Sequence, residues 1–254
     1  MKAYSEWGYD KVIIDKIEPT HFVRNFLVMS LVKKYSGKVG IRSVCEIGCG
    51  TGSLSCRLGS LGLGVYALDL DKNAIRLARK FNKNINVRYS SKDVLRIERS
   101  EKYDLVVCIE VLEHIKEDRK ALAKINRLLK PGGLLLMTVP IHEKYRREFD
   151  NRSGHIRRYN PAELLKKIKE AGFEISYSRH FNFPFLWLWY FLIYLPYSNK
   201  KEKEISHSRS AKKTLPKWIY ALNVINKFFL IDLLFNSKKY STDMVVVAQK
   251  YKNI

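Results

Sequence analysis

The feature that most constrains the fold is a glycine-rich turn directly after a short apolar run. The run covers residues 44–47 and is typical of a buried strand. Gly48, Gly50 and Gly52 then fall within five positions, ahead of a stretch with helical spacing. Glycine permits a positive φ and lets a ligand approach bare backbone, and the N-terminus of a helix favours a charged or polar ligand group. The sequence therefore predicts a ligand-binding turn between a strand and a helix.

Strand patterns and helical patterns alternate along most of the chain. Besides the first strand, we expect strands at residues 65–70, 85–91, 103–110, 133–140, 173–180 and 243–250. Helical patterns lie between most of them, and another precedes the first strand at residues 19–35. Such alternation is typical of a parallel sheet. The expected fold class is therefore α/β: a doubly wound, Rossmann-like sheet with helices on both faces and a helical insertion before the last strand.

That insertion divides the chain into four expected parts. A connection of about 60 residues that breaks the strand–helix rhythm normally carries function. We expect an N-terminal helical extension (1–40), a core (41–180), an aromatic and basic helical insertion (181–240) and the final strand of the core sheet (241–254).

The charge of the chain is strongly positive, at +22 for 254 residues. This predicts an anionic partner such as acidic lipid, nucleic acid or a phosphorylated substrate; the alternative is a lysine-rich solvated surface. The four cysteines form no CxxC pair, and the N-terminus lacks the apolar core of a signal peptide. Both observations favour a reducing cytoplasm.

Acidic residues follow several of the expected strands. Asp69 ends the second strand about 20 residues after the glycine turn, a position where an acid typically holds ribose hydroxyls. We interpret its neighbour Asp71 as a helix N-cap. Asp93 and Glu110 follow the third and fourth strands. Polar groups at the carboxyl ends of neighbouring strands indicate a nucleoside-binding edge. A nicotinamide dinucleotide is the main rival ligand, and the glycine pattern fits it poorly.

Five ordered motifs resemble those of class I S-adenosylmethionine-dependent methyltransferases. They are VCEIGCGTG, ALDLD, SSKDV, YDLVVCIEVLEHI and LKPGGLLLMTVP, and the resemblance covers roughly residues 41–180. It implies methyl transfer from S-adenosylmethionine, with the two reactants held in near-attack geometry.

The resemblance also implies roles for single residues. Glu46, Gly48, Cys49 and Gly50 would lie against the methionine part of the cofactor, although the family often has another small residue in place of Cys49. Asp69 would hold the ribose hydroxyls, with Leu70 beside it. Asp93 and Val94 would flank the adenine. Glu110 would close the pocket near the reacting centre and is a candidate catalytic residue.

A second group of residues suggests a metal. Glu110, Glu113 and His114 have i, i+3, i+4 spacing and would share one face of a helix. With His155 as a fourth ligand, they could bind a divalent metal. The set is similar to one in small-RNA 3′-end 2′-O-methyltransferases and to a related one in ubiquinone-type O-methyltransferases. The alternative is that Glu113 and His114 only cap or brace the helix.

The segment 141–159 is long, polar and rich in arginine, which indicates substrate binding. His155 within it is a candidate general base, because imidazole titrates near neutrality; alternatively it only fixes the loop. His142 is a weaker candidate for the same role. Arg146, Arg147, Arg157 and Arg158 could clamp a phosphate or carboxylate.

Two apolar stretches, 181–197 and 218–235, flank a basic segment within the insertion. The apolar run 183–195 is too short to span a bilayer. Aromatic residues beside lysines favour a membrane–water interface or a lid over a lipid-like acceptor. The alternatives are a helical subdomain packed on the sheet and a dimer interface.

The sequence leaves three functional hypotheses. The first is a methyltransferase, with oxygen as the expected acceptor atom, acting on a lipid-linked, quinone-like or glycan acceptor near the membrane surface. The second is a metal-assisted RNA 2′-O-methyltransferase, for which binding would depend steeply on salt. The third is a non-catalytic methyltransferase-fold partner at the membrane.

Overall fold

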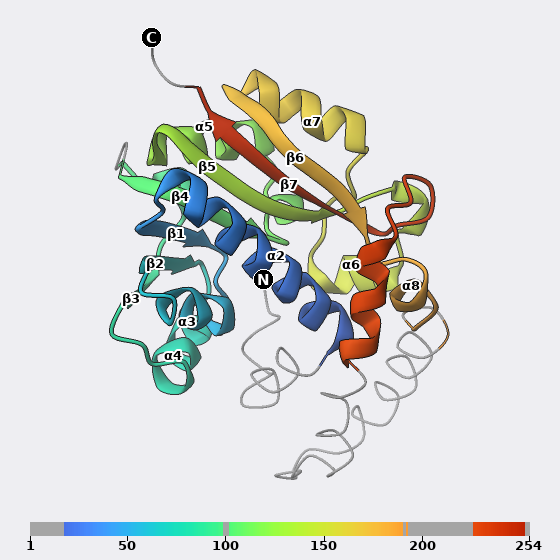
Figure 1. Cartoon of the computed structure of the whole chain (residues 1–254), viewed down its shortest axis with the longest axis horizontal. Helices are drawn as coiled ribbons and strands as arrows, with labels where there is room; N and C mark the ends of the chain where they lie inside the picture. The colour runs from blue at the N-terminus through green and yellow to red at the C-terminus, as the bar shows by residue number, and fades with distance from the viewer. Residues whose placement is uncertain (1–17, 99–101, 190–191, 193–225, 252–254) are drawn as a thin grey trace.

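The structure is a computed structural model that describes residues 18–98, 102–189, 192 and 226–251. Its centre is a seven-stranded sheet with strand order β3-β2-β1-β4-β5-β7-β6 (Figure 1). The strands are β1 (Ser43–Ile47), β2 (Gly64–Asp69), β3 (Val87–Ser91), β4 (Tyr103–Ile109), β5 (Leu129–Pro140), β6 (Phe173–Phe181) and β7 (Asp243–Lys250). With helices on both faces, this arrangement confirms the expected Rossmann-like α/β class.

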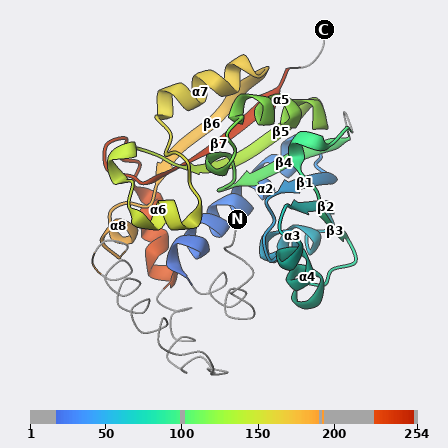
Figure 2. The same cartoon turned by 180° about the vertical axis from the view of Figure 1, so that it is seen from behind.

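Helices cover the two faces of the sheet unequally. The larger ones are α2 (Pro19–Val39), α3 (Ser53–Gly59), α4 (Lys72–Phe81), α5 (Asp118–Leu128) and α7 (Pro161–Glu170). Apolar residues of α2, α3 and α4 form one buried cluster with the sheet, and those of α5 and α7 form another. Figure 1 looks onto the face crossed by α2, and Figure 2 shows α5 and α7 on the opposite face.

Local capping interactions define several helix ends. The Asp71 carboxylate accepts a hydrogen bond from the backbone nitrogen of Asn73 at 2.7 Å, which confirms its interpretation as an N-cap. Asn160 caps α7 in the same way. Helix α2 ends at Gly40, whose φ of 66° is the left-handed conformation that glycine adopts without strain.

The direction of the last strand differs from the expectation of a parallel sheet. Strand β7 lies between β5 and β6 and pairs antiparallel to both. Phe181 at the end of β6 is paired with Asp243 at the start of β7. The chain thus returns as a hairpin-like connection, without the crossover that a parallel strand needs.

The described parts of the insertion pack on α2. They are α8 (Phe185–Trp189) and the short 3₁₀ helix η5 (Phe229–Leu234). Leu186 and Phe229 bury their side chains against Val23 of α2. The rest of both apolar stretches, and the basic segment between them, lie outside the described residues.

Candidate functional site

The glycine turn has the conformation that a close backbone approach requires. Gly48, Gly50 and Gly52 all have positive φ, at 72°, 52° and 81°. A Cβ atom on Gly48 would lie 2.2 Å from Cγ2 of Val111, so no larger residue fits there without displacing Val111. The turn therefore presents bare backbone at the carboxyl end of β1.

Asp69 ties this turn to the end of β2. Its Oδ2 accepts a hydrogen bond from the Gly50 nitrogen at 2.8 Å, and its Oδ1 accepts one from the Asp71 nitrogen at 2.8 Å. The Cys49 nitrogen donates to the Leu68 carbonyl at 2.8 Å, and Leu70 is 49% exposed. The structure thus brings the expected ribose-binding acid and the glycine turn to one edge of the sheet.

Glu46 lies within β1 and is buried. Burial raises the pKa of Glu46 to about 8, although the hydrogen bond from Ser55 Oγ lowers it and the charge of Asp69 adds to the rise. Burial also raises the pKa of the Cys49 thiol, with Glu46 and Asp69 contributing. Both groups are thus held neutral beside the turn near pH 7.

Asp93 and Val94 stand at the carboxyl end of β3. The Asp93 carboxylate accepts a hydrogen bond from the Leu95 nitrogen at 2.9 Å and so caps the 3₁₀ helix η1 (Val94–Arg96). Val94 is buried under this cap. The contacts of these residues with a cofactor, like those of Glu46 and Asp69, stay predictions.

Glu110 follows β4, but the helix expected there does not form. Glu110 has a φ of 52°, and the chain then makes only the single 3₁₀ turn η2 (Leu112–His114). Glu110 accepts a hydrogen bond from Thr138 Oγ1 at 2.7 Å and lies 3.6 Å from an Arg24 guanidinium nitrogen. The expectation that Glu110 shares a helical face with Glu113 and His114 is therefore wrong.

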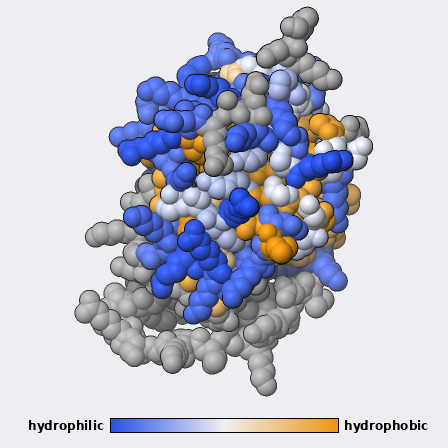
Figure 3. Space-filling view, turned by 90° about the vertical axis from the view of Figure 1, so that its left-hand side faces the viewer, coloured by the Kyte–Doolittle hydropathy of each residue, from blue (hydrophilic) through white to orange (hydrophobic). Residues whose placement is uncertain are grey.

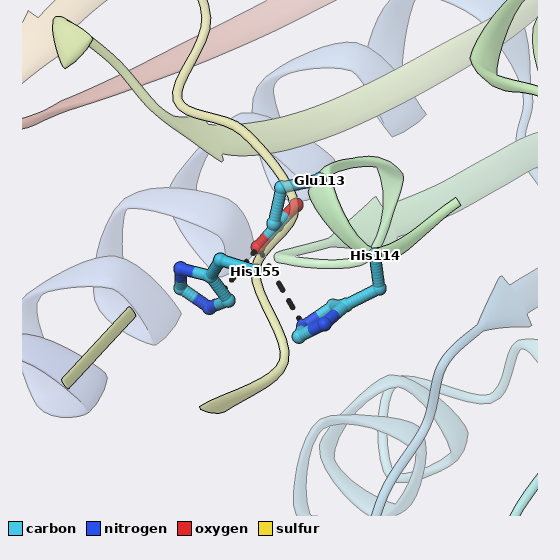
Figure 4. Close-up of side chains that lie close together, drawn as sticks. All are labelled: Glu113, His114 and His155. Atoms are coloured by element: carbon cyan, nitrogen blue, oxygen red, sulfur yellow. Dashed lines mark ion pairs between the residues drawn. The ribbon is translucent and has the colours of Figure 1, made fainter. Parts of the chain in front are cut away.

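Three of the four expected metal ligands do lie together. Ligand atoms of Glu113, His114 and His155 all fall within 4.8 Å of one another, and Figure 4 shows the Glu113 carboxylate between the two rings. The Glu113 Oε1 atom is 4.0 Å from Nε2 of His114 and 3.9 Å from Nε2 of His155. Glu110 is not part of this group, because its carboxylate faces Arg24 and Thr138.

Glu113 is a carboxylate in an unusually unfavourable environment. Its side chain is completely buried, and neither oxygen has a hydrogen-bond partner. Burial, together with the nearby charge of Glu110, raises the pKa of Glu113 well above its ordinary value. Such a group needs a proton, a cation or a metal beside it.

The arginines of the 141–159 segment make contacts within the protein. Arg157 pairs with Asp118, Arg158 with Asp150, and Arg146 with Glu143. A guanidinium nitrogen of Arg147 donates hydrogen bonds to the backbone carbonyls of Lys144 and Arg146. The structure therefore does not support the expected phosphate or carboxylate clamp.

His142 does not belong to the group formed by Glu113, His114 and His155. Its Nε2 is 2.9 Å from the Lys238 carbonyl, and burial lowers the pKa of the ring. The contact joins the segment after β5 to the chain just before β7, so His142 has a bracing role in the described structure.

Several side chains at this edge could not be found from the sequence. Arg24 reaches Glu110 from α2. Asp243, at the start of β7, accepts hydrogen bonds from Asn182 and Thr242, and burial raises its pKa to about 6, helped by Glu110. None of these residues stands in a motif, and only the pairing of distant elements brings them together.

Comparisons with known proteins agree with this geometry. Residues 45–137 match the model of a methyltransferase domain. The chain is 27% identical over 181 residues to a ubiquinone biosynthesis O-methyltransferase of Bordetella avium, a match that covers 65% of this chain and 75% of that one. The corresponding protein of Rickettsia bellii is 26% identical over 140 residues, which cover 54% of this chain and 57% of that one.

A solved structure shows the same fold. Magnesium protoporphyrin IX methyltransferase from Synechocystis, with bound S-adenosylhomocysteine, superposes with a TM-score of 0.59 at 14% identity and covers 98% of this chain and 97% of its own. The glycine turn tied to Asp69, the sheet order and the matched domain lead to one assignment. This chain belongs to the class I S-adenosylmethionine-dependent methyltransferases.

Proposed function

We propose that this enzyme methylates a hydroxyl oxygen of an apolar acceptor, quinone-like, lipid-linked or glycan-bearing, at the inner, anionic surface of a membrane. The observation that carries the proposal is a set of exposed apolar side chains on α2, α8 and the segment around η5, elements that contact one another; we call this set the apolar surface. Its exposed side chains are Phe26, Leu188, Leu192, Phe228, Ile231, Leu234, Phe235 and Tyr240. Exposed apolar residues gathered in one region mark an interaction site.

Helix α2 carries part of the apolar surface and also reaches Glu110 at the end of β4. Phe26 is exposed on this helix, while Arg24, two residues earlier, reaches Glu110 at the end of β4. Val23 is buried against Leu186 and Phe229 of the insertion. We propose that an acceptor whose apolar part rests on this surface presents its polar end toward Glu110.

The charge of the molecule supports an anionic surface as partner. The net charge is +22, and Lys227, Lys238 and Lys239 flank the described apolar residues. The face at the β3 edge is largely hydrophilic, with smaller apolar patches (Figure 3). Basic residues next to apolar ones favour binding to acidic lipid. Among the residues that the structure describes, no helix is both long and apolar enough to span a bilayer.

The glycine turn fits the cofactor, because Gly48, Gly50 and Gly52 all have positive φ and leave bare backbone at the carboxyl end of β1. When bound, S-adenosylmethionine supplies a methyl group on a positively charged sulfur. We assign Glu46, Gly48, Cys49 and Gly50 to its methionine part. Asp69 and Leu70 would hold the ribose, Asp93 and Val94 the adenine, and Glu110 the edge near the acceptor.

A hydroxyl acceptor needs help in losing its proton, and we assign this role to His155. Hydroxyls are poorly ionised near neutral pH, so a general base contributes to their methylation. The side chain of His155 is 12% exposed, and its Nε2 faces the Glu113 carboxylate. Names of relatives also favour oxygen, since both sequence relatives described above are O-methyltransferases.

A divalent metal fits the same three side chains. Glu113 offers a buried carboxylate with two unpartnered oxygens, and His114 and His155 direct Nε2 toward it. Carboxylate and imidazole together suit several divalent metals. Such a metal would lower the pKa of a coordinated hydroxyl. Glu113, His114 and His155 would then be its ligands, without Glu110.

RNA 2′-O-methylation remains the second candidate, because the same side chains and the net charge would also serve it. One experiment separates the two. Methyl transfer from labelled S-adenosylmethionine is measured with a prenylated phenol in phosphatidylglycerol vesicles and with a structured RNA carrying a free 3′ end. We expect product from the phenol only. Labelled RNA without labelled phenol would replace the first proposal, and no product from either would favour a different acceptor atom.

A further inference from the structure

Asp150 is a buried carboxylate outside every motif of the sequence. It lies in the short helix α6 (Glu148–Ser153) and is 0% exposed. Its Oδ2 accepts a hydrogen bond from the Arg147 nitrogen at 2.8 Å. Its Oδ1 accepts hydrogen bonds from Nδ1 of His155 and from Nε of Arg158, each at 2.9 Å. A carboxylate buried to this degree and facing a guanidinium is ionised and acts only as an acceptor.

His155 is held by this carboxylate on one side and faces Glu113 on the other. The backbone nitrogen of His155 also donates to the Asp150 carbonyl at 2.8 Å. Because Asp150 can only accept, Nδ1 of His155 must carry a proton. A neutral imidazole with a proton on Nδ1 has its lone pair on Nε2, and that atom lies 3.9 Å from Glu113 Oε1.

His114 shows the same arrangement with a different acceptor. Its Nδ1 lies 3.0 Å from the Gly154 carbonyl, which also only accepts. Both rings therefore direct the Nε2 lone pair toward the same carboxylate. Acceptors that fix the far nitrogen of a histidine are the usual way in which a protein orients an imidazole for proton transfer or metal binding.

We infer that Asp150 is the positioning residue of His155: it fixes the Nδ1–H tautomer and so keeps Nε2 free as a base or ligand. Arg158 also holds Asp150 in place, by donating to the same Oδ1 atom. The inference rests on the proposed function only for its effect on turnover, because the tautomer itself is a property of the protein alone.

The substitution Asp150→Leu tests this, because it removes both carboxylate oxygens with little change in side-chain size. An asparagine would not serve, since Arg158 donates to the same Oδ1 atom as His155 and would hold an amide oxygen there. Without an acceptor beside Nδ1, the proton of His155 moves to Nε2, which faces the Glu113 carboxylate. Nε2 is then no longer available to substrate or metal. Arg158→Gln is the matched control, because it removes another partner of Asp150 but leaves the carboxylate that orients His155.

The readout is the histidine tautomer, measured by long-range ¹H–¹⁵N NMR of the full-length labelled protein at alkaline pH. The His155→Gln spectrum identifies the signal. We expect the Nδ1–H tautomer in the native protein and in Arg158→Gln, and the Nε2–H tautomer in Asp150→Leu. Methyl transfer by Asp150→Leu should fall tenfold or more.

Two results would overturn the inference. One is an Nε2–H tautomer in the native protein, a measurement that does not depend on whether any variant folds. The other is an unchanged tautomer in a folded Asp150→Leu protein. A tautomer that switches while turnover stays the same would support the role of Asp150 and would instead remove His155 from the proposed chemistry.

Discussion

Oδ2 of Asp69 accepts a hydrogen bond from the backbone nitrogen of Gly50 at 2.8 Å. The acid expected to hold the ribose therefore also shapes the turn that is expected to receive the methionine part of the cofactor. Its other oxygen is bound by the Asp71 nitrogen. One side chain thus joins the ends of β1 and β2 before any ligand arrives, which is a form of preorganisation.

Replacing Asp69 with alanine should therefore remove two things at once, the ribose contact and the support of the turn. We expect affinity for S-adenosylhomocysteine, measured by isothermal titration calorimetry, to fall at least tenfold. Asp71→Ala is the control: it removes the N-cap of α4 and should lower the free energy of unfolding by about 1 kcal/mol, with affinity preserved. Equal affinity of the Asp69→Ala and native proteins would disprove the assignment of this pocket.

Removal of metal should lower turnover if Glu113, His114 and His155 bind one. We expect activity to fall after dialysis against a chelator and to return on addition of Co²⁺. The absorption bands of bound Co²⁺ should appear with the native protein and be absent from Glu113→Ala. Glu117→Ala serves as the control, since Glu117 is a half-exposed acid paired with Lys120. Turnover that is insensitive to the chelator would exclude the metal.

Acid should weaken the fold through Asp104. Burial alone would raise the pKa of Asp104, but hydrogen bonds from Lys130, Ser43 and Arg42 lower it from 3.8 to about 2. A depressed pKa in the folded state stabilises the protein above the ordinary pKa and is lost as the pH falls toward the folded value.

Asp104→Asn should therefore lower the free energy of unfolding at pH 7 by about 1 kcal/mol, a value reduced because the pair with Lys130 is partly exposed to solvent. The difference from the native protein, followed by urea unfolding, should shrink as the pH falls from about 4 toward about 2. A difference that stays constant over this range would show that the charge of Asp104 does not contribute.

The apolar surface should be required for membrane binding. We expect the double substitution Leu188→Asp and Leu234→Asp to reduce co-sedimentation with phosphatidylglycerol vesicles at least tenfold, because it places charges on residues that would contact the acyl region. Ile85→Asp is a matched control: Ile85 is 99% exposed and lies in the connection between α4 and β3. Vesicle binding that structured RNA abolishes, or that survives the double substitution, would argue against this surface.

Features encoded over a few neighbouring residues could be predicted from the sequence. The glycine turn, the positions of the strands and the cap at Asp71 all depend on local patterns. The direction of β7 could not be predicted, because an apolar run looks the same in a parallel and an antiparallel strand. Its place between β5 and β6 is decided by pairing between elements far apart in the chain.

The site was predictable to a similar extent. Glu113, His114 and His155 were expected to meet, and they do. Glu110 was expected on the same face, but its positive φ turns the chain before η2 and directs its carboxylate to Arg24. The role of Arg24 has no sequence signal, because only the folded chain brings it near Glu110. Asp150 stands five residues before His155, but no motif in the sequence indicates that the two side chains meet.

The pairing of Phe181 with Asp243 has a consequence for how such an enzyme could change its acceptor. The chain leaves the sheet and re-enters it at adjacent positions. The segment between them, residues 182–242, is therefore a cassette with fixed ends. Doubling the length of a flexible loop raises the free-energy cost of closing it by only about 0.6 kcal/mol. The cassette could therefore be lengthened, shortened or exchanged while the glycine turn and Asp69 stay unchanged, and acceptor preference could diverge independently of cofactor use.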